Sequence, residues 1–262
     1  MTVSRFHVPA MDCAGEEQLV RIALADVDRI NRIEFDSEQR DVLVDHDSTS
    51  RAIGAALEPL ALGARHVDDA SHISAADHPG PDRNALLIAL VINAGFFFGE
   101  LTVGLISRSM GLIADALDMG ADASVYALSL AAVSSAADRK KRLARASGYL
   151  QLGLATIGLI EVIRRFTIDT ELPDPTSMIA LSALALIGNI ITMVVLHRVR
   201  SSEVHLQASW IFTANDIKVN ALVIAAAIGV VAFDSATPDL IAGAFIFLVV
   251  ANGARRILGL SR

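Results

Sequence analysis

The sequence has 262 residues, of which 53% are hydrophobic and only one is cysteine, and its mean hydropathy is +0.50. This hydropathy is too high for an ordinary water-soluble domain, and a single cysteine excludes a disulfide framework or a cysteine-rich zinc module. The net charge of −7 is uneven, because residues 1–83 hold 8 Lys and Arg against 16 Asp and Glu, whereas the remainder holds 14 against 13. An acidic head therefore precedes a nearly neutral apolar body, and the acidity of the head argues against nucleic acid as a partner.

The head, residues 1–70, has the pattern of a small α+β domain. Alternating polar and apolar residues predict strands, and apolar residues three or four positions apart predict helices. Asp47 or Ser48 is the expected N-cap of the second helix. The expected order is ferredoxin-like, βαββαβ, with these segments: Thr2–Val8, Gly15–Ala25, Ile30–Asp36, Arg40–His46, a helix through Ile53, Leu57 and Leu60, and Ala61–Val67.

The loop before the first helix reads Met11-Asp12-Cys13-Ala14-Gly15-Glu16. It resembles the Met-x-Cys-x-x-Cys loop of the heavy-metal-associated domain, with Glu16 in place of the second cysteine. The two-thiolate copper(I) site that the resemblance implies is therefore broken. Cys13 could still bind a metal together with Glu16, since a thiol in front of a helix has a lowered pKa; the alternative is a degenerate loop retained for the fold. We expect His7, His46 and His66 to be surface histidines.

Residues 71–83 are expected to be a polar linker, and residues 84–262 to form a membrane domain of six spans, since each apolar stretch has about the 20 residues that cross a bilayer. Basic connections, such as Asp138–Arg145, alternate with acidic connections that include Asp234 and Asp239. Under the positive-inside rule both termini are cytoplasmic, and we expect the bacterial inner membrane. The six stretches are Asn84–Ile106, Met110–Ser134, Ser147–Thr167, Ser177–His197, His205–Phe233 and Thr237–Leu258.

The second stretch contains Asp118 and Asp122, which share one helix face because they are four residues apart. Two carboxylates this close inside a bilayer repel each other and are poorly solvated, so a cation or protons should compensate them. Asp115 lies three residues before Asp118 and is either part of this group or structural. The fifth stretch places Asp216 and Asn220 on one face, with Asn215 as an alternative amide. Together these residues predict an all-oxygen site for a hard cation.

Further polar residues lie within the spans. A lone amide in a membrane usually holds helices together, and this is the expected role of Asn93. A lysine inside a span needs a partner, and Glu100 or Asp115 is the expected partner of Lys218. We see no nucleophile–base pair and no cofactor motif, so we expect neither an enzyme nor a required cofactor.

The body resembles the cation diffusion facilitator family of divalent-metal transporters. The resemblance rests on the segment from Ser109 to Asp122 and, in order and spacing, on the residues Asn93, Glu100, Gly104, Gly188, Asn189, Asp216, Pro238 and Asp239. It implies a homodimer of six-helix protomers that binds a divalent metal between the second and fifth spans and exports it in exchange for protons. The family's ligand positions fall on Asp118, Asp122 and Asp216.

Three features depart from that family, and one of them is the linker after the second span, which has Lys and Arg where some members place a histidine-based accessory site. The family's usual fourth ligand, four residues before Asp216, is Phe212 here, so one ligand is missing unless Asn215 or Asn220 replaces it. Among the candidate cations manganese, iron, zinc and cobalt, this puts zinc in doubt and favours a harder ion such as manganese or ferrous iron. The sequence ends at Arg262 without the family's cytoplasmic C-terminal domain, and we expect the head to replace it, by pairing protomers or sensing metal. The alternative function is a non-transporting membrane metal sensor or scaffold that retains the transporter fold.

Overall fold

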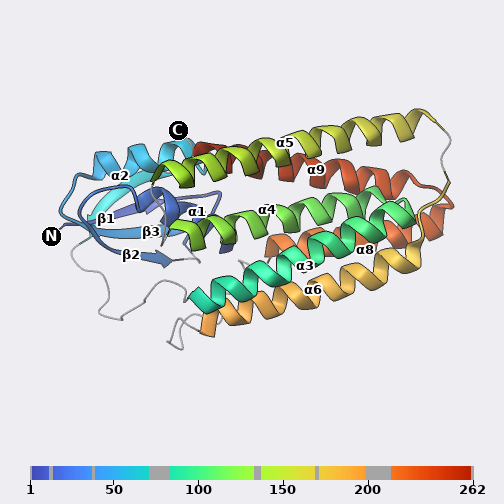
Figure 1. The fold of residues 1–262 in the computed structure, drawn as a ribbon, viewed down its shortest axis with the longest axis horizontal. Coiled ribbons are helices and arrows are strands. Elements are labelled where there is room, and N and C mark those ends of the chain that lie inside the picture. Colours follow the sequence, from blue (N-terminus) through green and yellow to red (C-terminus); the bar gives the residue numbers. More distant parts are fainter. Residues whose placement is uncertain are drawn as a thin grey trace.

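A computed structural model describes residues 2–11, 14–36, 39–70, 83–132, 137–168, 171–198 and 214–260. It consists of a small α+β head at one end of a long helical bundle (Figure 1). The head contains β1 (Thr2–His7), α1 (Ala14–Leu24), β2 (Ile30–Asp36), β3 (Asp41–His46), α2 (Ser50–Leu57), the short 3-10 helix η1 (Glu58–Leu60) and β4 (Arg65–Ala70). The sheet order is β2-β3-β1-β4, with antiparallel pairs throughout. The ferredoxin-like prediction is therefore confirmed.

Two local predictions in the head were wrong. The N-cap of α2 is Thr49, whose hydroxyl accepts a hydrogen bond from the Ala52 amide at 3.2 Å, and not Asp47 or Ser48. The last strand begins at Arg65 rather than Ala61, because Ala61 and Gly63 both have positive φ angles, of 52° and 73°. Left-handed residues reverse the chain and cannot continue a strand.

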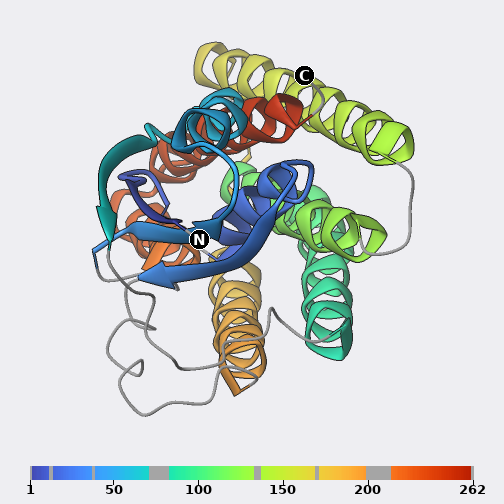
Figure 2. The ribbon, with the colours of Figure 1, turned by 90° about the vertical axis from the view of Figure 1, so that its left-hand side faces the viewer.

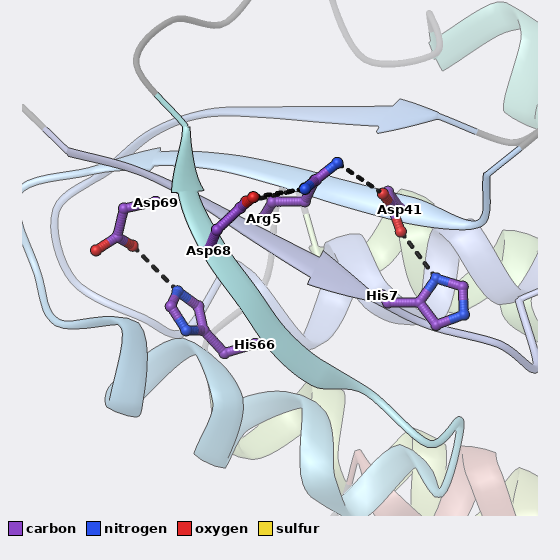
Figure 3. Close-up of polar contacts among 6 residues, drawn as sticks. All are labelled: Arg5, His7, Asp41, His66, Asp68 and Asp69. Carbon is purple, nitrogen blue, oxygen red and sulfur yellow. Dashed lines mark hydrogen bonds and ion pairs between the residues drawn. The ribbon is translucent and has the colours of Figure 1, made fainter.

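The two faces of the sheet differ in polarity. Phe6 and Val44 lie on the covered face and are buried with the helices. Arg5, from the other face, donates to Asp68, and His7 Nδ1 is 2.8 Å from Asp41 Oδ1 (Figure 3).

The three head histidines do not share one environment. Nε2 of His66 is 3.0 Å from Asp69 Oδ1 (Figure 3), and the hydrogen bond from the Ser4 hydroxyl, followed by that of His66, lowers the pKa of Asp69. His46 is 1% exposed, with Nε2 2.9 Å from Ser4 Oγ. His46 is therefore a buried histidine, against the sequence-based expectation.

The bundle contains α3 (Arg83–Ser107), α4 (Met110–Ala132), α5 (Ala137–Thr167), α6 (Pro175–Arg198), α8 (Ala214–Phe233) and α9 (Thr237–Gly259). Five helices in the described part are long and apolar enough to cross a membrane, namely α3, α5, α6, α8 and α9. α4 has 23 residues but carries three carboxylates, Asp115, Asp118 and Asp122. It packs against α3, α5, α8 and α9, so it lies inside the bundle. The length and apolar composition of these helices thus identify an integral membrane protein.

One expected connection is helical. The basic run Asp138–Arg145, which we expected between two spans, lies in the first turns of α5. The basic residues therefore lie within a helix instead of forming a loop.

The head is packed onto the ends of α4 and α9. Leu19 and Leu60 of the head share one apolar core with Val125 of α4 and with Ile257 of α9. A side chain added at Gly259 would collide with the backbone carbonyl of Pro59 in η1. Viewed along the bundle, the head lies across its end (Figure 2). Close backbone approach and a continuous core fix the head relative to the bundle.

Candidate metal site

A cavity of about 240 Å³ lies where α4, α8, α9 and the head helix α1 meet. Asp118 and Asp122 reach it from consecutive turns of α4, and Asp216 reaches it from the first turn of α8. A carboxylate in the first turn is favoured by the helix dipole. The structure thus brings three of the predicted ligands to one cavity.

These carboxylates are not assembled into a closed coordination shell. Within the described residues, no three His, Cys, Asp or Glu side chains lie close enough together to hold a metal ion. The side chains of Asp118, Asp122 and Asp216 are each partly exposed to the cavity. The arrangement is therefore an acidic vestibule whose side chains would have to converge to bind an ion.

Asn220 lies one turn further along α8 and is fully buried. Its Nδ2 donates to the backbone carbonyl of Asp216 at 2.8 Å, while its Oδ1 has no partner among the described residues. An amide oxygen is a suitable ligand for a hard cation. Asn215 also lies on α8, but its side chain and the whole of Phe212 fall outside the described part.

Glu100 of α3 and Asp115 of α4 are both 0% exposed. In the described part of the chain, none of their four carboxylate oxygens has a hydrogen-bond partner. Nδ2 of Asn93, seven residues before Glu100, donates to Ala89 of its own helix at 2.9 Å, so this bond does not join two helices. Buried carboxylates without partners are costly and mark functional positions more often than structural ones.

The expected pairing of Lys218 was wrong. Its side chain is exposed, whereas Glu100 and Asp115 are enclosed. A residue two positions after Asp216 points about 200° around the helix from it, so Lys218 faces away from the cavity. Glu161 of α5 forms ion pairs with Arg164 and Arg165 of the same helix, at 2.7 and 2.8 Å.

Asp239 has a role that the sequence did not reveal. We expected it in an acidic connection, but it is 1% exposed and lies in the first turn of α9. It accepts hydrogen bonds from the Ser109 hydroxyl (2.6 Å) and from the amides of Met110 (2.7 Å) and Gly111 (3.0 Å). These amides belong to the start of α4, where helices leave N–H groups without partners. Asp239 therefore caps α4 from another helix.

In the loop of the head, Glu16 is 6% exposed and forms an ion pair with Arg256 of α9. Both residues line the same cavity as Asp118, Asp122 and Asp216. Cys13 lies outside the described residues. Metal binding by Cys13 and Glu16 thus stays a prediction.

Comparisons with known proteins fit this arrangement. A family model for the cation efflux transmembrane domain matches residues 86–259, and one for the heavy-metal-associated domain matches residues 5–62. The metal cation efflux system protein CzcD of Cupriavidus metallidurans is 31% identical over 179 residues, 64% of this chain and 54% of that protein. The zinc transporter ZitB of Pectobacterium atrosepticum is 30% identical over 188 residues, which are 66% of this chain and 58% of that protein. The chain spans somewhat more than half the length of these relatives.

Proposed function

The chain belongs to the cation diffusion facilitator family and carries a heavy-metal-associated-like domain at its N-terminus, and we propose that it exports a divalent metal cation from the cytoplasm. The observation that carries the proposal is the cavity inside the bundle, which is lined by Asp118, Asp122 and Asp216 from two helices. Carboxylates of like charge that line one cavity between apolar helices attract cations and protons strongly, since a bound cation or proton relieves their mutual repulsion.

Exchange of metal for protons follows from the same side chains. Metal ions bind deprotonated carboxylates, so metal and protons compete for one set of oxygens. In the proposed cycle the cavity opens to the cytoplasmic side, its carboxylates converge on the ion, and release to the other side is accompanied by protonation. Movement of α4 and α8 against their neighbours provides the alternating access.

The proposal includes ion preference and setting. Asp118, Asp122, Asp216 and Asn220 offer oxygen only, and hard cations such as Mn²⁺ and Fe²⁺ prefer oxygen ligands. A homodimer in the bacterial inner membrane with both termini in the cytoplasm belongs to the same proposal. The family resemblance supports the homodimer, and the basic start of α5 supports the orientation.

Transport into proteoliposomes tests the function. We expect uptake of at least one ion from a panel of Mn²⁺, Fe²⁺, Zn²⁺ and Co²⁺, with proton movement in the opposite direction reported by a pH-sensitive dye. Asp122→Asn and Asp216→Asn should reduce the rate about a hundredfold, since each removes a charged ligand, and a lost charged contact is worth about 2–5 kcal/mol.

Asp234→Asn is the matched control, because Asp234 is an exposed aspartate beyond the end of α8, and it should transport normally. The alternative is a non-transporting sensor or scaffold, which the open spacing of the three carboxylates favours. Metal binding without flux of any ion in the panel would establish that alternative and reject the transporter.

A further inference from the structure

Among the described residues that line the cavity of the proposed cation site, one side chain is positive and four are acidic. Its lining includes the carboxylates of Asp118, Asp122, Asp216 and Glu16 together with the guanidinium of Arg256. Arg256 is contributed by the last turns of α9, and Glu16 by the first turn of α1. The head and the membrane domain thus place opposite charges on the wall of one cavity.

The Glu16 and Arg256 side chains form an ion pair with little solvent access. Oε1 of Glu16 contacts Nη1 of Arg256, and the two side chains are 7% and 16% exposed. The packing of the head on α4 and α9 holds this pair in place, because Leu60 shares an apolar core with Ile257 and Pro59 lies against Gly259. Whether Glu16 reaches Arg256 therefore depends on docking of the head.

Loss of one partner from such a pair has a definite electrostatic consequence. A buried charge without its partner is strongly unfavourable, and a guanidinium binds any carboxylate within reach through several N–H donors. For Arg256, the other carboxylates on the cavity wall are those proposed to bind the ion, Asp118, Asp122 and Asp216. An Arg256 released by Glu16 would compete with a cation for them.

We propose that Arg256 is a built-in competitor of the transported cation, and that Glu16 of the docked head holds it away from the cation site. The head thereby sets the cation affinity of the membrane domain: docking raises the affinity, and undocking lowers it. This inference rests on the proposed function, because it concerns the same carboxylates, but it is measured by binding rather than by flux.

Two single substitutions in the full chain should act in opposite directions. Glu16→Gln removes the carboxylate that forms the ion pair with Arg256, so the Kd for Mn²⁺ and Zn²⁺, measured by titration calorimetry in detergent, should rise about tenfold. Arg256→Gln removes the competitor and leaves Glu16 as an additional carboxylate, so the Kd should fall about tenfold. A unit charge a few ångströms from a bound ion changes affinity by about this factor in a partly solvated site.

A charge exchange tests the pair itself. Glu16→Arg combined with Arg256→Glu restores an ion pair across the same contact and should return the Kd to within about threefold of the parent, which is a small free-energy difference. Glu58→Gln and Arg255→Gln are matched controls, since both side chains are exposed and neither lines the cavity; they should leave the Kd unchanged. Thermal unfolding of every variant verifies that it is folded.

The outcomes separate this inference from the proposed function. If Glu16→Gln and Arg256→Gln both tighten binding, the head is a simple plug, and if both weaken it, the pair is only structural; either result overturns the inference. An unchanged Kd in both also overturns it. Loss of flux in Asp216→Asn would still support transport in each of these cases, whereas flux retained in Asp216→Asn would reject the proposed site whatever the Kd values are.

Discussion

Two kinds of buried carboxylate occur in the membrane domain, and they differ in what surrounds them. Asp239 accepts three hydrogen bonds from the start of α4. Glu100 and Asp115 are as deeply buried, but their oxygens have no partner among the described residues. Because its oxygens accept hydrogen bonds, Asp239 is identified as part of the structural framework. Because their oxygens have no described hydrogen-bond partner, Glu100 and Asp115 are identified as groups kept for a charge or a proton.

The largest expected effect is that of replacing Asp239. Asp239→Ala leaves the Ser109 hydroxyl and the amides of Met110 and Gly111 without an acceptor. Hydrogen bonds to a charged group are worth about 1.5–3 kcal/mol each, and they are not additive, so we expect a loss of at least about 3 kcal/mol in the free energy of unfolding. Denaturant titration of the detergent-solubilised protein measures it.

Asp239→Asn refines this test. The amide retains Oδ1, which accepts from Ser109 and Gly111, but replaces Oδ2, which accepts from the Met110 amide, by a donor. We therefore expect an intermediate loss, while Asp234→Asn, at an exposed position whose left-handed backbone asparagine also adopts, should change stability by less than about 0.5 kcal/mol. If Asp239→Ala were as stable as the parent, Asp239 would have no structural role, and the distinction between it and Glu100 would be lost.

The second prediction has the opposite sign. Glu100→Gln and Asp115→Asn remove buried charges that have no described partner, so each should raise the free energy of unfolding by about 1–2 kcal/mol. The same variants should transport more slowly, because stability gained at a functional position usually costs activity. A destabilisation comparable to that of Asp239→Ala would show that these carboxylates hold the framework together, and the distinction would fail.

Features that depend on residues close together in the sequence could be predicted, whereas contacts between residues far apart in the sequence could not. The common face of Asp118 and Asp122 depends only on helix periodicity, and the βαββαβ succession of elements in the head depends on local hydrophobic patterns, so both were accessible. The capping of α4 joins Asp239 to Ser109, which is 130 positions away in the sequence. The ion pair of Glu16 with Arg256 joins two domains. No local pattern encodes such contacts, because they exist only after the helices have packed.

The smallest expected effect concerns a carboxylate that accepts hydrogen bonds but is exposed to solvent. It separates the contribution of hydrogen bonding to stability from that of burial. Asp174 precedes α6 and accepts hydrogen bonds from the Ser177 hydroxyl at 2.5 Å and from the amides of Ser177 and Thr176. These contacts, the Ser177 hydroxyl first, lower the pKa of Asp174. The carboxylate therefore stabilises the folded protein above the ordinary aspartate pKa of about 4, and the stabilisation is lost as the pH falls through the lowered folded pKa.

Asp174→Ala should cost about 1 kcal/mol at pH 7, the usual value of an N-cap, and the difference from the parent should shrink as the pH falls below about 4. Asp174→Ser is the matched control, since a serine hydroxyl can cap α6 without titrating; it should lose less stability than Asp174→Ala at pH 7, and its difference from the parent should change with pH in parallel with that of Asp174→Ala, because the pH dependence comes from Asp174 of the parent. Thermal unfolding of the three proteins between neutral and acidic pH measures both effects. A loss for Asp174→Ala as large as that for Asp239→Ala would mean that hydrogen bonding alone, without burial, sets the contribution of a carboxylate to the free energy of unfolding.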